Sequence, residues 1–233
     1  MKNTLLLFLF ALLFVASGDN SSSTSAINLN DDGKNGFMTD SRDGQTYRIV
    51  TIGEQIWMAH NLNYATSNSY CYNDDASYCS KYGRLYTWAA AVGKSEDVCG
   101  YDHTCSLPSG NIQGVCPSGW HLPSKAEWKK LITTVGGAWV AALKLKSTYG
   151  WSNKSDSVSG NGTDAFLFSA LSSGVRRYGG DYGDEGDCTF FWSSTENSSN
   201  YAYYMGLFNY SNDSDLSYYY SKNYGFSVRC IKD

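Results

Sequence analysis

A short acidic stretch contains the residues whose types and spacing are best suited to catalysis or to metal binding. Asp181, Asp184, Glu185 and Asp187 lie within one glycine-rich segment, and Glu196 follows it. Paired carboxylates at a fixed separation hydrolyse glycosides, and carboxylate oxygens are ligands that Ca²⁺ takes. The spacing is not that of an EF-hand loop, and a loop rich in Asp is more often solvated or bound to a cation than catalytic. We therefore keep Asp181, Asp184 and Asp187 as candidate calcium ligands and expect no other cofactor.

Other groups that could react lack a supporting context. His121 lies between a Trp and a Leu and is interpreted as structural, and no Ser or Cys has the neighbours of a nucleophile. His60 and His103 are scattered and no C-x-x-C pair occurs, so a cysteine–histidine metal site is not expected. The glycines at 179–180 lack the strand–loop–helix context of a nucleotide loop. The sequence therefore predicts that the protein is not an enzyme.

Tyrosines crowd the last quarter of the chain. The sequence has 19 Tyr and 23 Gly against 18 Lys plus Arg. In an alternating strand only every second side chain faces the core, so Tyr218, Tyr219 and Tyr220 must place some rings outward. Tyr beside Ser, Asn and Gly is typical of adaptable recognition surfaces. The alternative interpretation is that Tyr merely fills strands, which it favours.

We therefore predict a binding face on the loops and strands between Arg176 and Tyr224, because recognition residues are commonly carried on loops of a rigid scaffold. The expected partner is a polysaccharide or an extracellular protein, and a structural role in an extracellular complex is the alternative. The chain has no Lys/Arg cluster and a net charge of −4, so nucleic acid is not expected. The predicted ligand-binding residues are Arg176, Arg177, Tyr178, Tyr182, Trp192, Glu196 and Tyr203.

Seven cysteines indicate an oxidising compartment, where disulfides persist. Cys71 with Cys79 and Cys99 with Cys105 bracket polar loops and are natural local bridges. Cys116 and Cys230 form the best long-range pair, whose closure would stabilise the fold by about 4–5 kcal/mol. The odd count leaves Cys188 unpaired or free to join another chain.

The N-terminus predicts export. Lys2 precedes an apolar run over residues 5–16, and small residues at positions 15 and 17 suit cleavage after Ser17. The run is shorter than the ~20 residues that span a bilayer, so residues 1–17 are predicted to be a signal peptide and no transmembrane span should remain. A lipoprotein would have Cys where Ser17 stands, so lipid attachment is not expected, although surface attachment stays an alternative. Residues 18–36 should form a flexible tether, and residues 37–233 the domain.

The rest of the chain has helix signals first and strand signals later. Strands are expected over residues 45–52 and 55–59, joined by a type II′ turn at Gly53 and Glu54. Helices are expected over residues 85–92, after the capping box of Ser124 and Glu127, and over residues 139–145. Short strands are expected over residues 166–171, 189–194, 201–208, 217–221 and 226–231. This order predicts an α+β domain with an antiparallel sheet.

Seven motifs in order resemble one family. They are DSRDGQTY (40–47), GEQIWMA (53–59) with Asn61 and Leu62, GRLYTW (83–88), CPSGWHLPS (116–124) with Glu127 and Trp128, FSAL (168–171), FWSSTE (191–196) and GFSVRC (225–230). Together they resemble the Fibrobacter succinogenes major paralogous domain, a family of exported bacterial domains without an assigned activity. The resemblance covers residues 40–233.

The resemblance also implies a fold and a location. The closing GFSVRC segment is similar to the end of formylglycine-generating-enzyme-like domains, which are elaborated C-type-lectin-like folds. It implies short helices packed on a twisted antiparallel sheet, with a cysteine near a helix bridged to one in the final strand, which agrees with Cys116 and Cys230. It also implies a bacterial protein that is secreted, periplasmic or held at the cell surface. Formylglycine generation depends on a pair of redox-active cysteines, and only Cys188 and Cys230 lie in that region, so an enzyme of that kind is the least favoured reading. A fold does not transfer an activity.

Overall fold

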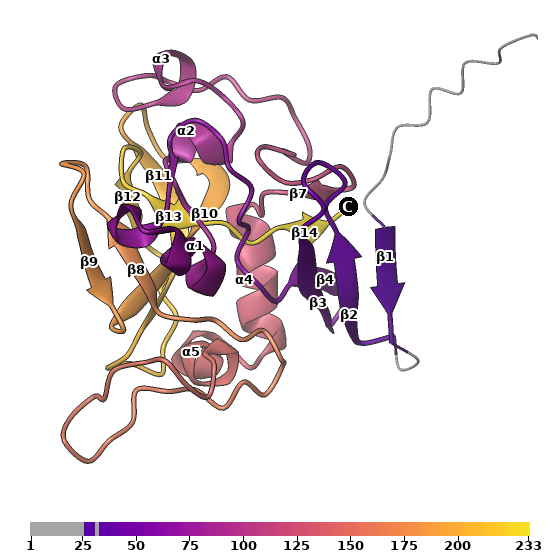
Figure 1. The fold of residues 1–233 in the computed structure, drawn as a ribbon, viewed down its shortest axis with the longest axis vertical. Helices are drawn as coiled ribbons and strands as arrows, with labels where there is room; N and C mark the ends of the chain where they lie inside the picture. Colours follow the sequence, from indigo (N-terminus) through magenta and orange to yellow (C-terminus); the bar gives the residue numbers. More distant parts are fainter. Residues whose placement is uncertain (1–25, 31–32) are drawn as a thin grey trace, which may run out of the picture.

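The computed structural model describes residues 26–30 and 33–233, which form two β-sheets with short helices between and around them (Figure 1). Most neighbouring strands run antiparallel; β10 pairs in parallel with β8 and β13 at single positions. The expectation of an α+β domain with an antiparallel sheet is confirmed at this level. The predicted signal peptide, residues 1–17, lies outside the described residues.

The first sheet has six strands in the order β1-β2-β3-β4-β14-β7. Their bounds are β1 (Ala26–Leu29), β2 (Asn35–Thr39), β3 (Thr46–Ile52), β4 (Gln55–Met58), β14 (Ile231–Lys232) and β7 (Trp120–His121). The β3–β4 turn pairs Ile52 with Gln55 and has Gly53 at φ +62°, a conformation that glycine adopts without a Cβ clash. The predicted two-residue hairpin is therefore present.

The range assigned to the tether contains part of this sheet. β1 pairs with β2 in the register Ile27 to Met38, and Ile27 packs on the core. The prediction that residues 18–36 are a flexible tether is wrong for residues 26–29 and 35–36, because their backbone belongs to the paired strands β1 and β2. Residues 18–25 lie outside the described residues.

The second sheet has eight strands, ordered β12-β11-β10-β13-β6-β5, with β8 and β9 attached through β10. Their bounds are β5 (Ser69–Tyr70), β6 (Leu85–Tyr86), β8 (Ser173–Arg176), β9 (Tyr182–Glu185), β10 (Cys188–Glu196), β11 (Tyr201–Phe208), β12 (Tyr219–Ser221) and β13 (Phe226–Ser227). The strands expected at 189–194, 201–208 and 217–221 are present with shifted ends. The range 226–231 is split between β13 and β14, and so links the two sheets.

The helices are short. They are the 3₁₀ turn η1 (Tyr72–Asp74), α1 (Ala76–Tyr82), α2 (Trp88–Ala91), α3 (Glu96–Cys99), α4 (Lys125–Thr134) and α5 (Ala138–Leu145). The predicted capping box is present at α4: the Glu127 amide donates to Ser124 Oγ at 3.3 Å, and Glu127 Oε2 accepts from the Ser124 amide at 2.8 Å. This reciprocal pair satisfies two helix-end donors.

Two element predictions need correction. Residues 85–92 do not form one helix, because Leu85 and Tyr86 pair with β13 before Thr87 caps α2. Residues 166–171 do not form a strand; Leu167 and Ser169 have positive φ, and one isolated bridge joins Ala170 to Lys146. A β-rich composition is insufficient there, because the positive φ of Leu167 and Ser169 interrupts an extended backbone.

Helix α4 stands between the two sheets in Figure 1 and joins them through its apolar face. Trp128 is fully buried, with its ring 4.6 Å from that of Trp57 in β4 and 5.7 Å from that of Phe191 in β10. Phe168 lies against the same cluster, 6.4 Å from Trp128. Burial of such rings is the dominant stabilising term in a core, and here it fixes the second sheet against the first.

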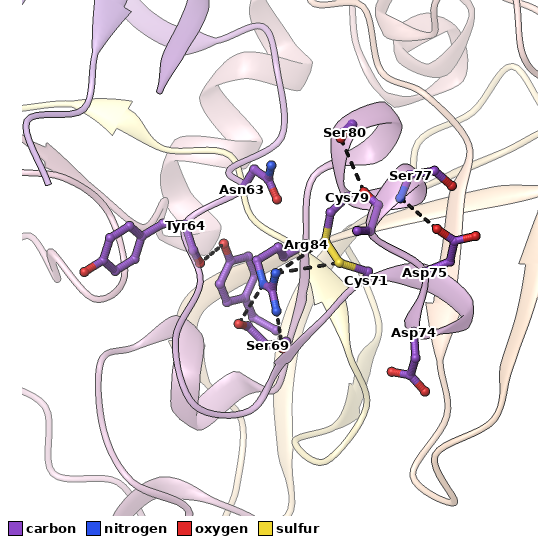
Figure 2. Close-up of a disulfide and its surroundings, with 12 residues drawn as sticks. Asn63, Tyr64, Ser69, Cys71, Asp74, Asp75, Ser77, Cys79, Ser80 and Arg84 are labelled. Atoms are coloured by element: carbon purple, nitrogen blue, oxygen red, sulfur yellow. Dashed lines mark hydrogen bonds between the residues drawn. A yellow bond between two sulfur atoms is a disulfide. The ribbon is translucent and has the colours of Figure 1, made fainter. Parts of the chain in front are cut away.

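Three disulfides join the pairs expected from spacing: Cys71–Cys79, Cys99–Cys105 and Cys116–Cys230. The last closes a separation of 114 residues. Figure 2 shows the first bridge, which ties α1 to the residue that follows β5, with the Arg84 guanidinium facing both sulfurs. Arg84 also donates to the side chain and carbonyl of Ser69, at 2.9 and 2.8 Å. The arginine and the bridge together fix the position of α1.

Candidate binding site

A pocket of about 370 Å³ opens on the second sheet, and all of its lining residues except Val175 lie within the range predicted for the binding face. Its walls come from β8 to β12 and from the segments that follow β8, β9, β11 and β12. Hereafter it is called the aromatic pocket. It is lined by Val175, Arg177, Asp184, Asp187, Cys188, Phe190, Phe208, Asn209, Tyr210, Tyr220 and Tyr224.

One wall of the aromatic pocket is a continuous set of rings. Phe190, 8% exposed, anchors it, with ring centroids 5.5 Å from Phe208 and 6.1 Å from Tyr220. Tyr210 stacks on Phe208 at 5.2 Å, and Tyr224 lies edge-on to Tyr220 at 4.5 Å. Strand alternation explains this wall, because residues two apart on β10 and β11 face the same side. Tyr210 is 67% exposed and so carries the wall to the surface.

The opposite edge of the aromatic pocket is polar. Arg177 donates to Asp181 at 2.9 Å and to Asp184 at 3.2 Å. The Asn209 side chain donates to Asp187 at 3.1 Å, and the backbones of these two residues also bond at 2.7 Å. Gly183 allows the Arg177 guanidinium to cross β9, since a Cβ there would lie 2.3 Å from it. The polar edge therefore offers a ligand both hydrogen-bond donors, on Arg177 and Asn209, and hydrogen-bond acceptors, on the carboxylates.

Cys188 lies at the floor of this pocket as a free, buried thiol. Burial raises its pKa, and the charges of Asp184 and Asp187 raise it further. Because the thiolate is the reactive form, this environment disfavours the link to another chain that the odd cysteine count suggested. Cys188 packs with the core face of β10.

Two predicted ligand-binding residues are structural. Trp192 is fully buried; its Nε1 donates to the Tyr86 carbonyl at 2.7 Å and its ring lies 4.3 Å from that of Phe226. Glu196 accepts from Lys222 Nζ at 2.5 Å and from the Cys105 amide at 2.8 Å. The prediction placed both on a ligand face. In the structure Trp192 lies in the fully buried part of β10, whereas Glu196, at the partly exposed end of the strand, is engaged by Lys222 and Cys105.

The other predicted residues divide into two places. Tyr178 is 72% exposed and lies 6.1 Å from Tyr224, at the rim of the aromatic pocket beside Arg177. The Arg176 guanidinium stacks on Tyr70 at 3.8 Å, and the Tyr182 hydroxyl donates to Asp74 at 2.5 Å, so both are tied to η1 and β5. The structure therefore brings Arg177 and Tyr178 together and sets Arg176 and Tyr182 apart from them.

Tyr203 belongs to a separate patch at the sheet edge, the edge patch, formed by Tyr201, Tyr203 and Tyr219. Their rings lie 5.3 Å (Tyr201 to Tyr219) and 6.3 Å (Tyr203 to Tyr219) apart, and Lys125 Nζ lies 3.5 Å from the Tyr203 ring centroid. Tyr218 and Tyr219 are 66% and 48% exposed, while Tyr220 packs on the core. The expected outward rings in this run are present.

The candidate calcium ligands hold other partners. Asp181 and Asp184 share the Arg177 guanidinium, and Asp187 holds Asn209. Within residues 26–30 and 33–233, no three His, Cys, Asp or Glu side chains gather as a metal-binding group. Sequence analysis missed three residues that line the aromatic pocket: Phe190, Phe208 and Asn209. The available signal was strand alternation, which places Phe190 on the same face of β10 as Cys188, and Phe208 on the same face of β11 as Tyr204.

Fold and site together define a sheet-rich domain with few short helices, closed by three disulfides and carrying an aromatic pocket on its second sheet. The sequence profile of the Fibrobacter succinogenes major domain matches residues 50–232, and the chain belongs to that family. No curated protein and no solved structure matches the chain. Among the described residues, none of the helices has the length and apolar character needed to cross a bilayer.

Proposed function

We propose that this domain is an exported, non-catalytic binding module that recognises carbohydrate in the aromatic pocket. The observation that carries the proposal is the pairing of a ring wall with a polar edge. Pyranose rings offer C–H faces that pack on aromatic rings and hydroxyl groups that both donate and accept hydrogen bonds. Tyr210 and Tyr224 supply the first contact, and Arg177, Asp187 and Asn209 supply the second. Pockets of this mixed lining are the usual small-ligand sites.

The same contacts favour binding over catalysis. Asp184 is engaged with Arg177 and Asp187 with Asn209, so each carboxylate is held in place by a neighbour. The thiol of Cys188 is kept protonated by burial. Calcium is a secondary option, in which a cation would displace the Arg177 guanidinium from Asp181 and Asp184.

Export and fold complete the proposal. Three disulfides suit an oxidising compartment, and we place the protein outside the cytoplasm: secreted, periplasmic or held at the cell surface of a bacterium. We assign it a C-type-lectin-like fold. The support is the Cys116–Cys230 bridge, which ties the loop before β7 to the residue preceding the last strand, together with α4 packed on a twisted antiparallel sheet.

The test is retention on insoluble polysaccharides, with cellulose, xylan, chitin and isolated bacterial cell wall as the probes, with and without chelator. Wild type should be retained on at least one of them. Tyr210→Ala should lose that retention, because it removes the most exposed ring of the wall, and Tyr101→Ala is the matched control: an exposed tyrosine of the Cys99–Cys105 loop, outside the pocket. Retention that disappears with chelator would assign the calcium option.

An extracellular protein is the second candidate partner, and the edge patch favours it. β12 is the outer strand of the second sheet; it carries the exposed ring of Tyr219, and its neighbour β11 carries the exposed ring of Tyr201. Flat tyrosine surfaces suit protein interfaces. Tyr219→Ala separates the candidates: it should leave polysaccharide retention intact and weaken only assembly into a protein complex.

A further inference from the structure

A second pocket, of about 240 Å³, lies where the first sheet meets α1, and it differs in character from the aromatic pocket. β3 and the segment after β4 form one side, and α1 forms another through Cys79, Ser80 and Tyr82. In Figure 2, Cys79 and Ser80 lie on the helix that the first disulfide holds, and Asn63 lies on the neighbouring loop. The disulfide therefore holds the α1 side of this pocket in place.

The charged residues of this lining are all basic. They are Arg48, Lys81 and Arg229, with His60 beside them, and none of the Asp and Glu residues that the structure describes lines the pocket. This occurs in a chain whose net charge is −4. Lys81 is partly neutralised by Glu185, at 3.3 Å. Arg48 and Arg229 have no carboxylate within ion-pair distance among the described residues, so the pocket keeps an excess of positive charge.

Arg229 is the deepest of these groups, with 1% of its surface exposed. Its guanidinium donates to neutral oxygens: the Asn61 side chain at 2.8 Å, the Phe168 carbonyl, and the Ser169 carbonyl at 3.0 Å. Burial is the main cause that lowers its pKa to about 9; Asp164 opposes this shift and the positive charge of Arg48 adds to it. A buried charge satisfied only by neutral groups is costly unless an opposite charge approaches it.

Arg48 is a second, half-buried cation of the pocket lining. Its amide donates to His60 Nδ1 at 3.2 Å, which assigns the hydrogen of the neutral ring to Nε2. Partial desolvation, together with the positive charges of Arg229 and Arg48, lowers the pKa of His60 to about 4, although the residue is exposed to solvent on one side. At neutral pH the ring is therefore an uncharged donor. An arginine fork with an adjacent N–H donor is the arrangement that recognises planar or tetrahedral oxyanions.

We propose that this pocket binds an oxyanion group, a carboxylate or sulfate, through Arg48 and His60 in the field of the buried Arg229. Polar side chains continue the lining through Gln45, Asn63 and Ser80, and the Tyr149 ring, 65% exposed, stands at the edge. The molecule that bears the oxyanion is therefore small and polar, and an acidic sugar residue fits this description. The site lies on other elements than the aromatic pocket, so it does not rest on the function proposed above.

The test titrates the intact domain with sodium galacturonate, with galactose as the uncharged analogue and with sodium sulfate as the free oxyanion, by ligand-observed NMR or calorimetry. Wild type should bind galacturonate and not galactose. Arg48→Gln should weaken that binding at least tenfold, and Arg48→Lys should weaken it less. Lys129→Gln, which removes an exposed charge on α4 outside the lining, should leave binding unchanged. Arg48 has no side-chain partner to lose among the described residues, so the melting temperature should be preserved.

The outcomes separate the sources of the oxyanion. Galacturonate bound far more tightly than sulfate assigns an acidic sugar, and equal binding assigns a free oxyanion. Wild type that binds neither anion at millimolar concentration, or Arg48→Gln that binds as wild type does, overturns the proposal. Tyr210→Ala should leave anion binding unchanged, which keeps this result distinguishable from the fate of the aromatic pocket.

Discussion

Two charged clusters of the second sheet contain the same kinds of side chain and differ in burial. In one, Lys222 is fully buried and its ammonium lies 2.5 Å from Glu196, which is 19% exposed, and 2.7 Å from the His103 carbonyl. In the other, Arg177 is 39% exposed and its partners Asp181 and Asp184 are 62% and 47% exposed. The buried pair ties the Cys99–Cys105 loop to β10, whereas the exposed cluster borders the aromatic pocket.

The difference teaches that burial decides whether a charged side chain is committed to its partner in the fold or can exchange that partner with solvent. A buried ion pair cannot be broken cheaply, because removing one partner strands the other without water. Exposed pairs contribute roughly 0–1 kcal/mol, since water replaces them. Arg177 can therefore exchange Asp184 for a ligand hydroxyl at little expense to stability, and Lys222 cannot exchange Glu196.

The largest expected effect on stability comes from one of two aromatic residues that sequence analysis placed on the same ligand-binding face, Trp192 and Tyr178. Trp192→Ala should lower the free energy of unfolding by about 3–5 kcal/mol, because it leaves a cavity between β10, β6 and β13. Tyr178→Ala should change it by no more than about 0.5 kcal/mol, since the ring is mostly exposed. Urea denaturation of both variants measures the two changes in the free energy of unfolding. Equal changes would contradict the assignment of Trp192 to the core and of Tyr178 to the exposed rim.

Glu196→Ala should have the next largest effect, a loss of about 3 kcal/mol, because the Lys222 ammonium is left buried with one carbonyl partner. The double variant Glu196→Ala with Lys222→Met should recover most of that loss, as it removes the stranded charge. Chemical denaturation of the three proteins tests this. A single variant within 1 kcal/mol of wild type would show that the pair behaves like a surface one.

A third cluster lies between these extremes and predicts a pH dependence. His121 is buried and contacts Glu127 at 2.7 Å and Asp233 at 2.6 Å. Burial lowers its pKa, but the hydrogen bonds and charges of Glu127 and Asp233 outweigh this and raise it above 6.5. Because the folded pKa is raised, the stabilisation is complete below pH 6.5 and is lost as pH rises through the folded value.

The measurement is the free energy of unfolding between pH 6 and pH 9, in wild type and His121→Gln. Wild type should lose up to about 1 kcal/mol over this range relative to the variant. Parallel curves would mean that the pKa of His121 is the same in the folded and unfolded states.

The smallest expected stability change is that of Arg177→Gln, less than about 0.5 kcal/mol, since its partners are solvated. The same variant should nevertheless weaken polysaccharide retention, because the guanidinium borders the aromatic pocket. Thermal melting and retention are measured on the same preparation. A large drop in melting temperature would show that Arg177, like Lys222, stabilises the fold.

Local signals in the sequence were sufficient for several elements and insufficient for the site. The capping box of Ser124 and Glu127, the Gly53 turn and the three cysteine pairs depend on near neighbours or on spacing, and the structure has all of them. The roles of Trp192 and Glu196 depend on what covers β10, and Lys222 and Phe226 reach it from segments distant in sequence. Alternation assumes one open face, and β10 has none along most of its length, so pattern alone could not separate its buried rings from exposed ones.

The central claim is that the aromatic pocket binds carbohydrate through its exposed rings. The most direct measurement is calorimetric titration with soluble oligosaccharides of whichever polysaccharide retains the domain, using wild type, Tyr210→Ala and the Tyr101→Ala control. The account predicts that Tyr210→Ala weakens binding at least tenfold, about 1.4 kcal/mol, with an unchanged melting temperature, and that Tyr101→Ala binds as wild type does. Equal affinity in all three proteins, or a wild type that binds none of the sugars, would contradict it.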